Sequence, residues 1–269
     1  MNFDDCKIET LIDSGNGKWC EDGLLLTSNF IGILDGATPI DIYEFKGYET
    51  QACWFVNEFI NKFSKFSCLK NDIENICIKI CEQLNIEFDL NVEEYNKPIS
   101  TVVVLELKGN NIVFNHLSDC HSYVRLKTGK TLHFTDERIC NIAKKTIHVS
   151  IEKYESDKNR KEAIKSQKIK NREMLNIDKG YFALSLDNKW KGNFIKNSVE
   201  VSMIDRILIC SDGYNRLFDE YELLTIDEFL NHNQSLLNGL KLLREFEKNE
   251  TTNKCVKKSD DAAAMLVLF

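Results

Sequence analysis

The sequence has only two prolines in 269 residues, and it has no Gly/Ser-rich linker and no internal repeat. Linkers between domains are usually rich in such residues, so nothing in the chain marks a domain boundary. We therefore expect one domain over residues 1–269. A chain of this length should bury roughly 75% of its unfolded surface without metal or disulfide staples, so a metal would more readily be catalytic than structural.

Long apolar runs and blocks of basic residues are also missing. No run approaches the ~18 residues of a membrane span, and the opening MNFDDCKIET lacks the apolar core of a signal peptide. The 35 Lys and Arg are outnumbered by 42 Asp and Glu, which gives a formal charge of −7 and no basic footprint for nucleic acid. We expect a cytoplasmic protein that binds neither nucleic acid nor membrane.

The ten cysteines form no CxxC pair. Disulfide frameworks and structural zinc sites show characteristic paired spacings, which are absent from this sequence. The closest two cysteines, Cys77 and Cys81, have the spacing of one helix face. We expect most of the cysteines to be small buried hydrophobic residues.

Hydrophobic periodicity predicts both helices and strands. Apolar residues recur at helical spacing in 51–66, 73–84 and about 233–246. The apolar stretch over residues 101–134 is interrupted by short polar turns, which predicts an antiparallel meander. Because a helix pair is inserted into an antiparallel strand order, the predicted class is α+β, with helices covering sheet faces. The predicted buried strands are 24–28, 30–34, 101–107, 111–117, 122–126, 206–210 and 262–269.

One segment differs from the rest in composition. Residues 152–176 are highly charged and contain few large apolar side chains. The segment is either an exposed helix or a mobile lid, since it has too little apolar surface to dock firmly.

Acidic residues gather at the ends of the predicted strands. Asp35 directly follows one strand, and Glu21 and Asp22 lie just before its hairpin partner, so the open end of the hairpin should collect all three. Asp212 leaves a later strand and Asp260 enters the last one. If those two strands pair antiparallel, their acids also share one end.

Converging carboxylates raise one another's pKa unless a cation neutralises them, and ligands that are all oxygen favour Mg²⁺ or Mn²⁺ over zinc. Asp-Gly occurs at both Asp35–Gly36 and Asp212–Gly213, where glycine lets the backbone approach a ligand. For any single aspartate, capping of a turn is the simpler interpretation. The joint pattern favours a metal centre.

These residues also carry a family resemblance. The sequence resembles the metal-dependent serine/threonine protein phosphatases (the PPM, or type 2C, family) over nearly the whole chain, as a bacterial-like single-domain member. The matching motifs occur in the family's order: CED at 20–22, ILDG at 33–36, ISTVVVLELKGNNIVFNHLSDCHSYV at 99–124, LICSDGYNRL at 208–217 and SDDAAAMLVLF at 259–269.

The resemblance implies a four-layer α-β-β-α sandwich, with two antiparallel sheets between helical layers and two Mn²⁺ or Mg²⁺ ions at one end. It implies hydrolysis of phosphoserine and phosphothreonine in phosphorylated proteins by a metal-bridged water, without a covalent phosphoenzyme. The implied catalytic residues are Asp35, Asp212 and Asp260. The implied metal ligands are Asp35, the Gly36 carbonyl, Asp212, Asp260, and Glu21 and Asp22 directly or through water, with Asp119 for a third ion. Asp119 has an alternative role as a simple strand end.

The sequence also departs from the family pattern. Ala37 stands where some members carry a histidine that could act as general acid, and His121 is a substitute candidate. Gly17 stands where many members have a phosphate-binding arginine, so Lys18 is the predicted substrate-binding residue, although it lacks the bidentate fork of an arginine. The family places a variable flap near 152–176.

Two other functions remain open. Cys210 and Arg216 have the Cys-x5-Arg spacing of cysteine-dependent phosphatases, but Asp212 between them would repel both a thiolate and a phosphate. The third possibility is a catalytically weakened phosphatase-like domain that binds phosphoproteins or another partner. Retention of every candidate metal carboxylate argues against it.

Overall fold

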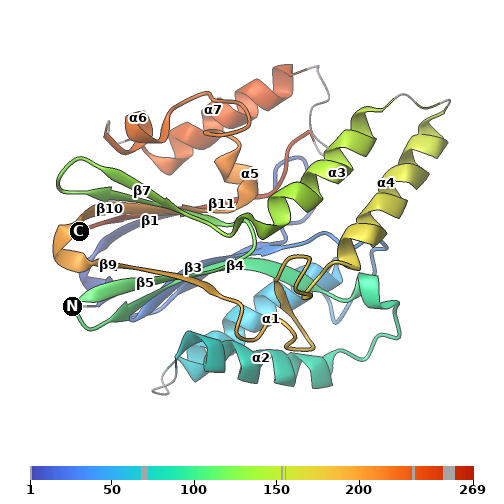
Figure 1. Cartoon of the computed structure of the whole chain (residues 1–269), viewed down its shortest axis with the longest axis horizontal. Helices are drawn as coiled ribbons and strands as arrows, with labels where there is room; N and C mark the ends of the chain where they lie inside the picture. The colour runs from blue at the N-terminus through green and yellow to red at the C-terminus, as the bar shows by residue number, and fades with distance from the viewer. Residues whose placement is uncertain (1, 68–71, 153, 155, 232–233, 251–257) are drawn as a thin grey trace.

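The structure is a computed structural model that describes residues 2–67, 72–152, 154, 156–231, 234–250 and 258–269. Two antiparallel sheets lie face to face between helical layers (Figure 1). This arrangement confirms the predicted α+β class and the four-layer sandwich.

One sheet has five strands in the order β1-β11-β10-β6-β7, and the other has the order β2-β3-β4-β5-β9, with the short β8 also paired to β4. The strands of the first sheet are β1 (Lys7–Asp13), β6 (His121–Leu126), β7 (Thr131–Phe134), β10 (Ile204–Cys210) and β11 (Ala262–Leu268). Those of the second are β2 (Asp22–Leu26), β3 (Phe30–Gly36), β4 (Ile99–Lys108), β5 (Asn111–Leu117), β8 (Leu184–Ser185) and β9 (Ile195–Glu200).

Helices cover the outer face of each sheet, and one helix pair projects from the end of the sandwich (Figure 1). The second sheet is covered by α1 (Gln51–Phe66) and α2 (Ile73–Glu87), and the first by α5 (Asp212–Asn215), α6 (Ile226–Asn231) and α7 (Leu236–Asn249). The projecting pair is α3 (Cys140–Ile151) and α4 (Asp157–Arg172). Single-turn 3₁₀ helices lie at Phe3–Asp5, Glu94–Asn96, Glu137–Ile139 and Val201–Met203.

Capping side chains define where the long helices begin. The Thr50 hydroxyl accepts a 3.0 Å hydrogen bond from the Cys53 amide at the start of α1, and Ser235 plays the same part for α7. The helix predicted at 51–66 is confirmed, and the one predicted at 73–84 extends to Glu87. The helix predicted at 233–246 begins later because Ser235 caps it, and residue 233 itself lies outside the described residues.

Hydrophobic cores hold the layers together. Alternate residues along the strands form the core between the sheets, which includes Ile31 and Ile33 from β3 and Ile209 from β10. Leu34 on the opposite face of β3 packs with the α1 side chains instead. Cys210 packs in the third core, on the outer face of its sheet beneath α5 and α7. Five of the eight cysteines that the structure describes are buried, as expected from the sequence.

The predicted meander over 101–134 is wrong at its centre. β4 and β5 form a hairpin in one sheet, and β6 and β7 form a hairpin in the other. The chain changes sheet at Ser118, whose φ of 68° gives a left-handed backbone that ends the strand. β1 and β9 were not predicted, because both are edge strands with few buried side chains.

The charged segment 152–176 contains helix α4, in which no side chain is buried. The predicted helix is therefore present, and the mobile lid stays a prediction. Residues 153 and 155 of this segment lie outside the described residues. In the described parts of the chain, no helix is both long enough and apolar enough to cross a membrane.

Candidate functional site

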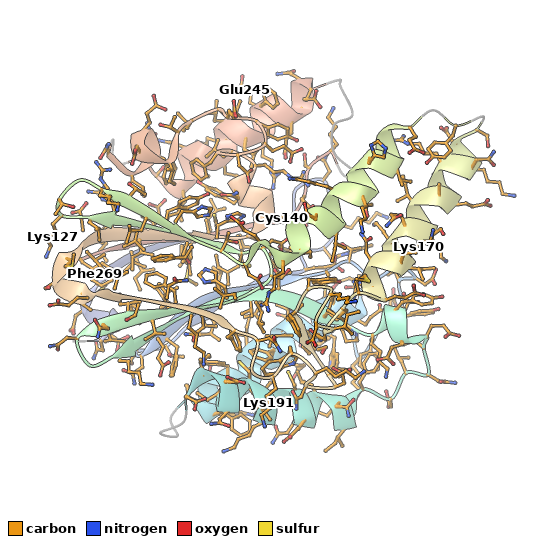
Figure 2. The ribbon with its side chains drawn as sticks, viewed as in Figure 1. Lys127, Cys140, Lys170, Lys191, Glu245 and Phe269 are labelled. Carbon is orange, nitrogen blue, oxygen red and sulfur yellow. The ribbon has the colours of Figure 1, made fainter. Side chains whose placement is uncertain are left out.

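A cavity of about 310 Å³ opens at one end of the sandwich, beside the projecting helices α3 and α4. Figure 2 shows Cys140 at the base of α3, close to the ends of the sheets, and Lys170 low on α4. Five of the predicted site residues line this cavity: Asp35, Gly36, Asp119, Asp212 and Asp260. Strand ends from both sheets therefore contribute to its floor.

Strand register explains why these acids meet. Asp22 lies directly opposite Asp35 in the β2–β3 pair. β10 and β11 are antiparallel neighbours with Cys210 opposite Ala264, so Asp212 and Asp260 follow and precede their strands at the same end. Both pairings were expected from the sequence.

Burial and mutual repulsion disturb the protonation of the acids. Burial, and then the charges of Asp22, Asp212, Asp119 and Asp260, hold the pKa of Asp35 well above its usual range. Burial and the charge of Asp212 raise the pKa of Asp119 to about 7. Such shifts require the carboxylates to lie close together in a poorly solvated place.

Two of the predicted acids are satisfied by hydroxyl groups. Both carboxylate oxygens of Glu21, which is 2% exposed, accept hydrogen bonds, at 2.5 Å from Thr38 Oγ1 and 2.7 Å from Thr50 Oγ1. Ser211 Oγ donates to Asp22 at 2.8 Å, a bond that opposes the increase in the pKa of Asp22 caused by burial. Glu21 therefore contacts Thr38, which lines this cavity, but does not line the cavity itself.

A guanidinium holds a third acid. Arg216 Nη2 lies 3.0 Å from Asp260 Oδ2, and the Arg216 side chain lines the cavity. The next residue, Asp261, accepts a 2.7 Å hydrogen bond from the Glu21 amide, which ties the two sheets together.

Within the residues that the structure describes, no three His, Cys, Asp or Glu side chains are arranged to hold a metal ion as they stand. Glu21, Asp22 and Asp260 each accept hydrogen bonds from protein side chains. The donor chemistry nevertheless fits a divalent cation. No group in the described part of the chain donates a hydrogen bond to the Asp35 carboxylate, and four acidic neighbours disfavour its charge. A hard cation is the partner that such a set of oxygens selects.

Basic side chains form part of the cavity wall, and most were not predicted. Lys168 and Arg172 of α4 line it, whereas Lys18 is exposed on the loop between β1 and β2 and does not line it. Arg172 Nη2 donates to the Ala37 carbonyl at 3.0 Å, which ties α4 to the loop after Asp35. In the sequence, Lys168 and Arg172 stand four residues apart among many other basic residues, so no pattern singled them out.

Two alternative catalytic residues lie elsewhere. The ring nitrogens of His121 contact His133 and Asn215, and burial lowers the pKa of His121 to about 3. A histidine that is neutral at physiological pH is not a ready general acid. Cys210 is fully buried on the outer face of its sheet, and burial raises the pKa of its thiol well above the usual range. This environment opposes thiolate formation.

The fold is shared with known phosphatases. No family model and no curated protein matches the sequence. A bacterial serine phosphatase superposes with a TM-score of 0.60 at 15% identity, over 98% of this chain and 97% of that one. PstP/Ppp from Mycobacterium tuberculosis gives 0.57 at 13% identity, over 98% of both chains. The catalytic domain of PstP in complex with two manganese ions gives 0.54 at 14% identity, over 98% and 97%.

This chain therefore has the fold of the bacterial serine/threonine phosphatases over nearly its whole length, which confirms the predicted resemblance at the level of the fold. At these identities the similarity speaks for the architecture, and the chemistry has to be argued from the residues in the cavity.

Proposed function

We propose that this protein is a metal-dependent phosphatase that hydrolyses phosphoserine and phosphothreonine in proteins, with residues 1–269 acting as one domain. The observation that carries the proposal is the convergence of Asp35, Asp119, Asp212 and Asp260 on one cavity, at the end of a fold shared with serine/threonine phosphatases. Mutually repelling, partly buried carboxylates are costly to a fold, and a bound cation would offset that cost.

In this proposal, Asp35, Asp212, Asp260 and the Gly36 carbonyl hold two Mn²⁺ or Mg²⁺ ions, and Asp119 is available to a third. Glu21 and Asp22 act from further back, because hydroxyl groups already occupy them. The manganese ions of PstP support this choice of metal. When bound, two such ions would neutralise the phosphoryl oxygens and activate water for attack on phosphorus.

The basic residues of α4 could attract the phosphate group of a substrate to the cavity. Lys168 and Arg172 line the same cavity as the aspartates, so a phosphate monoester dianion bound there would meet both these cations and the proposed metal ions. Arg172 remains cationic although burial lowers its pKa, since a guanidinium does not lose its proton in proteins. We propose these two residues as the groups that attract the substrate, and we keep Lys18 as a proposed substrate-binding residue on the strength of the family resemblance alone.

A specific observation favours a second candidate function. Arg216 lies 3.0 Å from Asp260, so one proposed metal ligand is already paired with a protein cation, as expected of a catalytically weakened, phosphoprotein-binding domain. The same cavity would then bind the phosphate group without hydrolysing it.

A phosphatase assay separates the two functions. Purified protein is given p-nitrophenyl phosphate or a phosphothreonine peptide, with Mn²⁺, Mg²⁺ or EDTA. We expect hydrolysis of both with either metal and none with EDTA. Full activity after exhaustive chelation would contradict the metal-dependent chemistry. Saturable binding of the phosphopeptide without turnover under any metal would identify the binding domain instead.

A further inference from the structure

Arg216 is a buried cation inside an acidic cavity. Its side chain is 11% exposed, and its three nitrogens approach three different carboxylates. Nη2 lies 3.0 Å from Asp260, Nε lies 3.4 Å from Glu220, and Nη1 lies 3.8 Å from Glu247. The closest of the three contacts is to the residue proposed above as a metal ligand.

Glu247, on α7, is the unusual member of this group. Its side chain is completely buried, and Oε1 has no hydrogen-bond donor within the described parts of the chain. Its other oxygen accepts a 2.6 Å bond from Arg244, which also donates to the backbone carbonyl of Asp260 at 2.7 Å. A buried carboxylate oxygen without a donor is expensive, so Glu247 Oε1 is a vacant acceptor beside the Arg216 guanidinium.

We infer that Arg216 is an internal counter-cation for Asp260, which moves toward Glu247 when a divalent cation takes its place. This inference rests on the metal centre of the proposed function. In the metal-free protein the guanidinium neutralises Asp260. When an ion arrives, Nη1 closes the 3.8 Å gap to Glu247 Oε1, and the Asp260 carboxylate is released to the ion.

The consequence is unequal metal binding. The ion beside Asp35 meets no competing protein cation, because no group in the described residues donates to that carboxylate. The ion beside Asp260 has to displace a hydrogen-bonded guanidinium, and its apparent affinity falls accordingly. The protein should therefore hold one ion tightly and the other weakly. Activity should then change with the free metal concentration in the range of the dissociation constant of the weaker site.

Isothermal titration of Mn²⁺ into the metal-free protein tests this inference. We expect one tight and one weak class of site in the wild type, and a weak class tightened at least tenfold in Arg216→Gln. Glu247→Gln should weaken that class further, because Arg216 loses the charge toward which it moves. Arg206→Gln is the matched control, since Arg206 is 17% exposed, pairs with Asp205 and donates to a carbonyl outside the cavity.

Circular dichroism verifies the fold of each variant. If Arg216→Gln does not fold, Arg216→Lys keeps the charge without the fork and should give an intermediate tightening. A folded Arg216 variant that binds Mn²⁺ as the wild type does overturns the inference and leaves the metal-dependent phosphatase standing. Unchanged Mn²⁺ binding with a raised KM for p-nitrophenyl phosphate also overturns it, and assigns Arg216 to the phosphate. No binding by the wild type or any variant overturns the inference and the metal centre together.

Discussion

Asp22 and Asp35 face each other directly across the β2–β3 pair, and the charge of Asp22 helps to raise the pKa of Asp35. Directly opposed residues of an antiparallel pair project to the same side of the sheet. Ile31 and Ile33 lie on the same face of β3 as Asp35, and they belong to the core between the sheets. The face that is apolar along most of β3 thus becomes acidic at its end, where the cavity opens.

Removal of one charge from this pair should separate function from stability. We expect Asp35→Asn to lower turnover at least about 100-fold, because a ligand charge is lost. The metal-free variant should melt about 2–4 °C higher than wild type, since relief of like-charge repulsion is worth about 1 kcal/mol. Calorimetry with EDTA and a p-nitrophenyl phosphate assay measure the two effects. Asp205→Asn, which removes one partner of a surface ion pair, is the control. Equal activity in both variants would mean that Asp35 has no catalytic role.

The contribution of Asp119 to the stability of the metal-free protein should fall as pH rises. The pKa of Asp119 is about 7 in the folded protein and about 3.9 in an unfolded chain, so the folded state binds more protons between these values. The midpoint of the wild type minus that of Asp119→Asn, both measured in EDTA, should therefore decrease from about pH 4 to about pH 7 and then level. The difference isolates Asp119, because other groups, such as His121, titrate in both proteins. A difference that increases over the same range would contradict the assigned shift.

Arg172 should affect substrate binding more than the chemical step. We expect Arg172→Gln to raise KM for a phosphothreonine peptide about tenfold, since it removes a cation from the cavity wall and the tether to the Ala37 carbonyl. Arg160→Gln on the same helix is the control, because Arg160 bonds the Ser150 carbonyl away from the cavity. Steady-state kinetics at saturating Mn²⁺ measure both. A loss confined to kcat would move Arg172 from binding to catalysis.

The outer part of the α3–α4 pair should act in protein recognition. Replacement of 150–163 by a short Gly/Ser linker keeps the cavity-lining residues Thr146, Lys168 and Arg172. We expect activity on a phosphoprotein to fall severalfold more than activity on p-nitrophenyl phosphate, which is too small to reach these turns. Exchange of the exposed Lys241 and Glu245 on α7 for glutamine, outside the replaced segment, is the control. Equal losses on both substrates would argue against recognition.

Cys210 should be replaceable. Its thiol packs on the outer face of β10, so Cys210→Ala should cost about 1 kcal/mol of stability and leave turnover within about twofold of wild type at saturating Mn²⁺. Chemical denaturation and the phosphatase assay check the two parts. A folded Cys210→Ser variant that binds Mn²⁺ but has no activity would restore the thiol mechanism.

Local patterns predicted the parts of the fold that local physics controls. The apolar faces of α1 and α2 and the acids at strand ends are visible in sequence because periodicity and strand termination are short-range properties. The change of sheet at Ser118 was not visible, since a left-handed serine resembles any other turn residue. The edge strand β1 was missed because its pairing with β11 is settled about 250 residues away.

The candidate site was predictable in its acids and not in its cations. Aspartates beside apolar strands stand out, and all those lining the cavity except Asp261 had been singled out. In the sequence, Arg216 stood out only for its Cys-x5-Arg spacing from Cys210. Its contact with Asp260 depends on the packing of α5 against β11, which the sequence does not show. Lys18 drew attention because the resemblance placed it near the phosphate, whereas the cations on α4 become relevant only through the docking of a helix pair.

The hydrogen bonds that join the sheets at the cavity floor have a bearing on folding order. Ser211 to Asp22 spans 189 positions along the chain, and the Glu21 amide to Asp261 spans 240. Contacts between such distant segments form slowly, because a long loop has to close before they are gained. A nascent chain that lacks β11 has no complete floor to this cavity. The proposed catalysis would consequently begin only after β11 has paired, and its onset would report that pairing.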